Sequence, residues 1–147
     1  MILYARGIEQ LLDKFGNISA RIESEINQVV SIAVRDIHER ALDEHKWISR
    51  TGETERDGIK RSVEGLVGTV ELATNVAVYL HEGTKAHEIM PRNKMALRFP
   101  LAGNFVFSRR VYHPGTAKDP FLYNAAEYLE AEIISRFDKA ICDLTGG

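Results

Sequence analysis

Cysteine is nearly absent from this chain, because Cys142 is the only one among 147 residues. A single thiol forms neither an intrachain disulfide nor a cysteine cage for zinc, so the sequence excludes both ways of stapling a small fold. We expect Cys142 to pack as a small apolar side chain, since it lies late in an amphipathic segment. A chain of this length buries about 70% of its unfolded surface. One domain over residues 1–147 is therefore expected.

Long apolar runs are missing as well. No stretch approaches the ~20 apolar residues of a transmembrane helix, so we expect no membrane span. The N-terminal segment MILYARGIEQ has no basic region followed by an apolar one. We therefore expect no secretory signal.

Signatures of catalysis are also scarce. The sequence has no Gly-x-Ser-x-Gly elbow, no Walker A loop and no Gly-x-Gly-x-x-Gly turn. His81 and His87 stand six residues apart across Gly83, whereas the His-Glu-x-x-His zinc motif needs both imidazoles on one helix face. We therefore expect no catalytic residue, no cofactor and no metal. A metal hydrolase remains the third hypothesis, built on His81, Glu82, His87 and His113.

The net charge is small, but charge is unevenly distributed. The whole chain carries −2 at pH 7, which gives no global attraction to nucleic acid or anionic membranes. Residues 85–118 contain seven basic side chains and one acid, Glu88, so this segment carries +6 and the remainder −8. This distribution fits a protein that binds copies of itself or an anionic partner. It fits equally well solvated strand edges that collect Lys and Arg for solubility.

The N-terminal half contains one dominant helical pattern. Apolar residues from Ile18 to Ala41 recur every three or four positions, which predicts a long amphipathic helix with one buried face. Before it, residues 1–6 weakly favour a short strand. A helix over residues 8–15 is expected to end at Gly16-Asn17.

A second helix is predicted at the C-terminal end. Asp119 is expected as its N-cap and Pro120 as its first residue, and Gly146-Gly147 as its end. Its apolar face contains Leu122, Ala126, Leu129, Ile133, Phe137 and Ile141.

Strand signals lie between the two helices. Val67–Leu72 is predicted to be a strand, and residues 51–61 a loop or a frayed helix. Val76–Leu80 fits either a strand or a two-turn helix with Asn75 as its N-cap. Two alternating runs flanking residues 102–104 predict a hairpin with Phe105 and Phe107 on its buried face.

The order of these elements predicts an α+β fold. A long N-terminal amphipathic helix and a C-terminal helix are expected to pack on a small, mainly antiparallel β-sheet with a protruding hairpin. Basic and aromatic residues alternate in the hairpin segment. A stacking platform for single-stranded nucleic acid therefore stays open beside the buried-face interpretation.

Several short motifs follow one another in a characteristic order. Gly7 and two helices precede Arg50-Thr51-Gly52, and the later motifs are YLHEGT at 79–84, HPGT at 113–116, DPFL at 119–122 and the pair Ala125-Ala126. Together they resemble the neck or tail-completion family of long-tailed double-stranded-DNA bacteriophages. Two features depart from that pattern. Residues 53–60 intervene before the expected Ser-Ile-like pair, and His81 stands where an aliphatic or aromatic residue is usual.

The resemblance implies a structural virion protein and not an enzyme. Such proteins form hexameric or dodecameric rings at the head–tail junction, between portal or head-completion proteins and tail-terminator proteins. They help to retain packaged DNA, whose backbone the ring can contact. The implied location is the virion neck, and the host cytoplasm during assembly. The runner-up is a small nucleic-acid-binding domain that uses residues 85–118.

Assembly is expected to depend on residues around the two turn motifs and in the basic segment. Phe121 among them is interpreted either as a core anchor or as an interface anchor. The candidate interface residues are Gly83, Thr84, Lys85, His87, Arg98, Arg109, Pro114, Gly115, Pro120 and Phe121.

Overall fold

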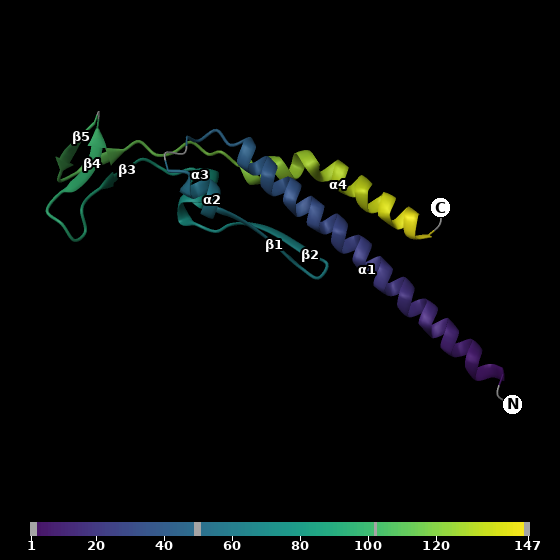
Figure 1. The fold of residues 1–147 in the computed structure, drawn as a ribbon. Coiled ribbons are helices and arrows are strands. Elements are labelled where there is room, and N and C mark those ends of the chain that lie inside the picture. Colours follow the sequence, from purple (N-terminus) through teal and green to yellow (C-terminus); the bar gives the residue numbers. More distant parts are fainter. Residues whose placement is uncertain (1–2, 49–50, 102, 146–147) are drawn as a thin grey trace.

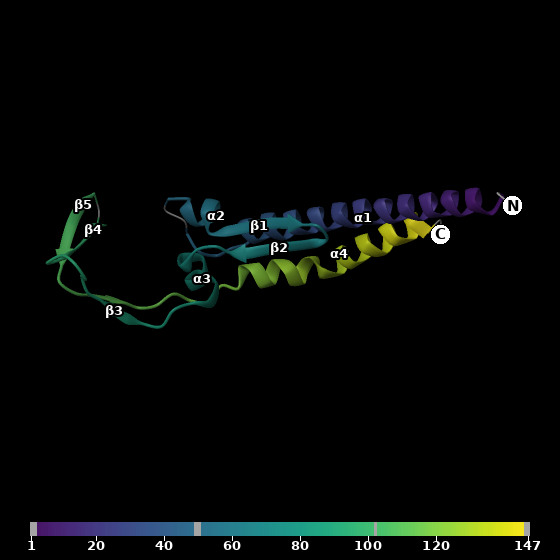
Figure 2. The same ribbon diagram turned by 90° about the horizontal axis from the view of Figure 1, so that it is seen from below.

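The computed structural model describes residues 3–48, 51–101 and 103–145, and it has the predicted α+β fold. The molecule is elongated (Figures 1 and 2). The long helices α1 (Leu3–Asp43) and α4 (Phe121–Thr145) lie side by side at one end, and a narrow projection of strands extends from the other. The short helices α2 (Glu53–Asp57) and α3 (Asn75–Glu82) lie between these two parts.

Within the described residues the strands form three separate antiparallel pairs. In the first pair, β1 (Ile59–Glu64) and β2 (Val67–Leu72) form a hairpin that packs along α1. The other two pairs build the projection. They join β3 (His87–Ile89) with β6 (Val111–His113), and β4 (Leu97–Leu101) with β5 (Asn104–Ser108).

Helix α1 is longer than the sequence pattern predicted. It is continuous from Leu3 to Asp43, so the strand expected over residues 1–6 is wrong for residues 3–6, and Gly16-Asn17 does not end a helix. A glycine inside a helix costs only about 1 kcal/mol relative to alanine. Propagation of an existing helix is favourable enough to continue through that penalty.

The apolar stripe of α1 is buried in its C-terminal half only. Val30, Ala33 and Val34 are buried, whereas Phe15 and Ile18 are 61% and 50% exposed. The exposed part belongs to the segment of α1 that projects beyond the C-terminal end of α4 (Figure 1). Gly68 of β2 allows the hairpin to approach the buried part, because a Cβ at that position would lie 2.3 Å from a Val34 methyl carbon.

The core lies where α1, β1 and α4 meet. Its buried members are Ala41, Ile59, Phe121 and Ala125. Phe121 is 1% exposed, and its ring contacts those of Trp47 and His81 edge-on, with centroids 6.1 and 5.2 Å apart. Phe121 is therefore a core anchor, which decides between the two interpretations of this residue.

Two local predictions are corrected around the short elements. Residues 59–61, expected in a loop or frayed helix, belong to strand β1, which pairs along its whole length with β2. Of the two alternatives for residues 76–80 the helix is confirmed, but Thr74 rather than Asn75 caps α3, since its hydroxyl accepts a hydrogen bond from Ala77 N.

The last helix begins one residue later than predicted, at Phe121. The Asp119 carboxylate accepts a hydrogen bond from Lys46 N at 2.6 Å, which ties the start of α4 to the segment after α1. Cys142 and Ile141 were both predicted to pack in the core. This is wrong, because Cys142 is exposed and Ile141 is 49% exposed. The expected Gly146-Gly147 stop lies outside the described residues. In the part of the chain described, no helix has both the length and the apolarity to cross a membrane.

An ion pair joins α1 to α4. Arg136 Nη1 lies 2.6 Å from Asp36 Oδ2, and Arg35 Nη2 lies 2.9 Å from Oδ1. Burial raises the pKa of Asp36, but the hydrogen bonds from Arg136 and Arg35 outweigh this and hold the pKa below its ordinary value of 3.8. Because the pKa of Asp36 is lower in the folded chain than in the unfolded chain, the pair stabilises the fold fully at pH values above the unfolded pKa. This contribution is lost as the pH falls through the folded pKa.

Asp36→Asn is expected to lower the free energy of unfolding by about 1 kcal/mol near neutral pH, since the pair is partly exposed. The difference from the unmodified chain should vanish as the pH falls below the folded pKa of Asp36. Urea denaturation over a series of pH values measures it. Asp57→Asn is the control, because Asp57 pairs only with the neighbouring exposed Arg56 among the described residues, and should have almost no effect. An Asp36 effect that persists unchanged in acid would contradict the expected linkage.

Candidate functional site

The projection, here called the arm, comprises residues 84–116 and holds most of the predicted interface residues. It leaves the body beside α3 and extends away from α4, with the β3–β6 pair nearer the body and the β4–β5 pair at the tip (Figures 1 and 2). Lys85, His87, Arg98, Arg109 and Pro114 all belong to it. Lys85 and Pro114 lie at its base beside the Thr84–Thr116 bridge, whereas Arg98 belongs to β4 at its tip.

The base of the arm is a close crossing of two backbone segments. Thr84 and Thr116 exchange backbone hydrogen bonds of 2.9 and 3.1 Å, and the Thr84 hydroxyl also accepts from Thr116 N at 3.0 Å. Gly83 and Gly115 flank this bridge with φ of 76° and 93°. A Cβ on Gly115 would lie 2.3 Å from the carbonyl oxygen of Thr84. Glycine is thus required here both for its conformation and for the approach.

Gly115→Ala is expected to open this base and to cost about 1–3 kcal/mol, through the strained φ and the collision with Thr84. Hydrogen exchange should rise at the amides of Thr84 and Thr116 while α1 and α4 remain protected. Gly103→Ala is the matched control. It has a similar φ of 83° but nothing within 4 Å of the added carbon, so it leaves these amides unchanged. Exchange at Thr84 and Thr116 that is as slow in Gly115→Ala as in the control would contradict the expected opening.

The four residues considered for a metal are divided between two places. His81 is 1% exposed and contacts Phe121, with Nδ1 3.0 Å from Glu82 Oε1. His87 and His113 face each other across β3 and β6, with ring centroids 5.2 Å apart. No group of three or more His, Cys, Asp or Glu residues in the described part of the chain is arranged to hold a metal ion.

Glu82 connects the core histidine with the end of the basic segment. Its carboxylate also accepts a hydrogen bond from Lys118 Nζ at 3.0 Å. The Lys118 hydrogen bond, followed by that of His81, holds the pKa of Glu82 below its ordinary value. Lys118 is therefore neutralised by the body, in contrast with the cations of the arm.

The tip of the arm differs from the prediction in one respect. Phe105 and Phe107, expected on a buried face, are 56% and 66% exposed. The opposite face of this hairpin contains the half-buried Phe99 and Val106, which pair with each other across the strands. The Arg98 guanidinium carbon lies 3.6 Å from the centroid of the Phe105 ring, a cation–π contact in solvent.

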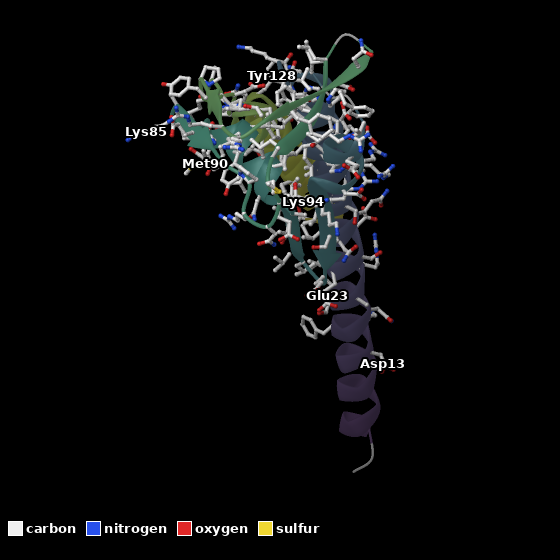
Figure 3. All side chains as sticks on the ribbon, turned by 90° about the vertical axis from the view of Figure 1, so that its left-hand side faces the viewer. Asp13, Glu23, Lys85, Met90, Lys94 and Tyr128 are labelled. Carbon is white, nitrogen blue, oxygen red and sulfur yellow. The ribbon has the colours of Figure 1, made fainter. Side chains whose placement is uncertain are left out.

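Most cations of the arm have no acidic partner. Arg110 pairs with Glu88 at 3.6 Å, but within the described residues no ion pair involves Lys85, Arg92, Lys94, Arg98 or Arg109. Exposed apolar side chains accompany them. Figure 3 looks onto the arm, and there Lys85 and Met90 lie toward one side of the molecule. The arm thus presents unneutralised positive charge next to apolar surface.

The outcome for the predicted interface residues is mixed. Phe121 lies in the core, with the half-buried Pro120 beside it, whereas Gly83, Thr84 and Gly115 shape the base of the arm. Comparisons of the chain with protein-family models, with curated proteins and with solved structures found no match.

Proposed function

We propose that this chain is a structural protein of the bacteriophage head–tail junction, and that it forms a ring connecting the portal side to the tail. The arm is the observation that carries the proposal. A two-stranded hairpin is marginally stable alone, yet this one presents Phe105 and Phe107 to solvent far from the core. Such a surface gains stability when a partner covers it.

The order of the motifs supports the phage assignment. The turn motifs at residues 79–84 and 113–116 meet at the base of the arm, and the motif at 119–122 opens α4. A basic arm on an otherwise acidic chain suits head-to-tail contacts, in which unlike surfaces of neighbours meet. The resemblance implies a hexamer or dodecamer in the virion neck, with portal or head-completion and tail-terminator proteins above and below. Arm cations that face the channel can tolerate the DNA backbone.

Electron microscopy tests this proposal at two levels. Negative-stain images of the purified chain should show rings. Antibodies raised against it should label the neck of tailed particles made from the genome that encodes it. Antibodies against the major capsid protein serve as the control and should label heads only. Labelled tail tips or capsid faces, or unlabelled particles, would reject the assignment.

A small nucleic-acid-binding domain is the second candidate, and the exposure of Phe105 and Phe107 favours it. Exposed aromatic rings beside Arg98 are the elements of a stacking platform for single strands. This function predicts salt-dependent binding of single-stranded oligonucleotides by the monomer. Phe105→Ala with Phe107→Ala should then weaken binding by about 1–3 kcal/mol per stacked base. Fluorescence anisotropy at two salt concentrations measures it, and binding that is indifferent to both changes excludes it.

A further inference from the structure

Helix α4 has a second apolar surface besides the one in the core. Ala126, Glu127, Glu130, Ile133 and Ile134 line a groove of about 400 Å³, here called the outer groove. Ile134 is 54% exposed, and Tyr123 and Ile141, at helical spacing on the same side, are 62% and 49% exposed. An apolar stripe of this kind, left in solvent, marks an interaction site.

The charge beside the outer groove is negative. Glu127 and Glu130 are exposed, and within the described residues no ion pair involves either of them. The exposed Asp138 follows further along α4. The groove therefore combines apolar surface with unneutralised acids, which complements the exposed phenylalanines and unneutralised arginines of the arm.

The arm cannot reach the outer groove of its own chain. In both views the arm extends from the α3 end of the body, away from the middle of α4 where the groove lies (Figures 1 and 2). Of the occupants available to this chain, the arm of a second copy matches the groove in both charge and apolar character.

We propose that the arm of one copy docks in the outer groove of α4 on a second copy. Phe105 and Phe107 cover the apolar floor, and Arg98 and Arg109 face Glu127 and Glu130. The two surfaces are different, so the contact is heterologous and leaves a free arm and a free groove for further copies. The contact deepens the proposed function, since it supplies the head-to-tail interface on which a ring rests.

Charge exchange between the two surfaces tests the contact. Arg98→Glu with Arg109→Glu, or Glu127→Arg with Glu130→Arg, should each weaken self-association about 100-fold or more, because like charges then meet. Lys60→Glu with Arg61→Glu, and Glu64→Arg with Glu71→Arg, are matched reversals on the exposed edges of β1 and β2. These controls should associate normally. Sedimentation velocity of the full chain at low salt measures association, and thermal melting confirms that every variant folds.

Restoration of association by a second charge reversal is the decisive test. A chain with both surfaces reversed should associate again, and the two singly reversed chains should associate when mixed although each is monomeric alone. An unmodified chain that stays monomeric overturns the contact, and so does a doubly reversed chain that fails to associate. Duplex or single-stranded DNA is added as a probe. If arm reversal abolishes DNA binding while groove reversal leaves association intact, the occupant of the arm is nucleic acid and the contact is rejected.

The two proposals fail separately. If antibodies against the chain label the virion neck but the groove reversal leaves self-association unchanged, only the contact is contradicted. If the charge reversals change self-association as expected but the antibodies label no neck, only the phage assignment is contradicted.

Discussion

Phe121→Ala is expected to lower the free energy of unfolding by about 3–5 kcal/mol, the range for truncating a buried phenylalanine. Phe121 is 1% exposed and holds together residues that come from distant parts of the sequence. Its ring contacts Trp47 after α1 and His81 at the end of α3.

Urea denaturation followed by circular dichroism measures this change. Phe107→Ala is the control with the same chemistry, since Phe107 is 66% exposed and its truncation should change stability by less than about 0.5 kcal/mol. The two variants are expected to have opposite effects on stability and on self-association. Phe107→Ala weakens self-association, whereas Phe121→Ala affects it only through unfolding. A stable Phe121→Ala chain with lost association would instead place Phe121 in an interface.

The sequence predicted the elements whose pattern is local and long. The stripe from Ile18 to Ala41 lies within α1 and residues 67–72 form β2. The hairpin predicted from runs 97–101 and 105–111 forms as β4 and β5 with its turn near Gly103, although β5 ends at Ser108 and Val111 belongs to β6. Each carries its own periodicity or turn signal. Strand β1 has no such signal, and its pairing with β2 comes from the partner rather than from its own residues.

Exposure was harder to predict than secondary structure. Alternation places Phe105 and Phe107 on one face of a strand, but which face is covered depends on where the hairpin lies relative to the helices. The arm extends away from the body, so neither face has a core to meet. The same limit applies to Cys142 and Ile141 near the end of α4, which are exposed although the neighbouring Ala140 is buried.

The sequence identified which residues belong to the candidate site but not how they are arranged in space. The basic segment and the turn glycines Gly83 and Gly115 were identified from sequence. Their crossing at Thr84 and Thr116 is a contact between segments 32 residues apart and is invisible to local patterns. The acids of the outer groove were missed because Glu127 and Glu130 resemble any solvated helix face. Only the exposed Ile134 beside them distinguishes that face.

Under the proposed head–tail junction role, reversing three arm cations is expected to stop the production of infectious particles. Lys85→Glu, Arg98→Glu and Arg109→Glu together change residues that are exposed and form no ion pair within the described part of the chain. The triple variant should therefore melt like the unmodified chain. Attraction to an acidic neighbour or to DNA becomes repulsion, and contacts of this kind cost several kcal/mol when like charges meet.

Complementation measures this outcome. A phage lacking the gene is grown with the variant supplied in trans, and titre and particle morphology are recorded. Micrographs should show heads and tails that remain separate. Lys60→Glu, Arg61→Glu and Lys139→Glu are the matched reversal outside the arm, and this chain should restore the titre. Normal titres of tailed, DNA-filled particles from the arm variant would mean that the basic segment is only a solvated surface. The electrostatic basis of assembly would then be wrong. The arm reversal and the matched reversal change the net charge equally, so they affect the titre differently only if the arm binds a partner.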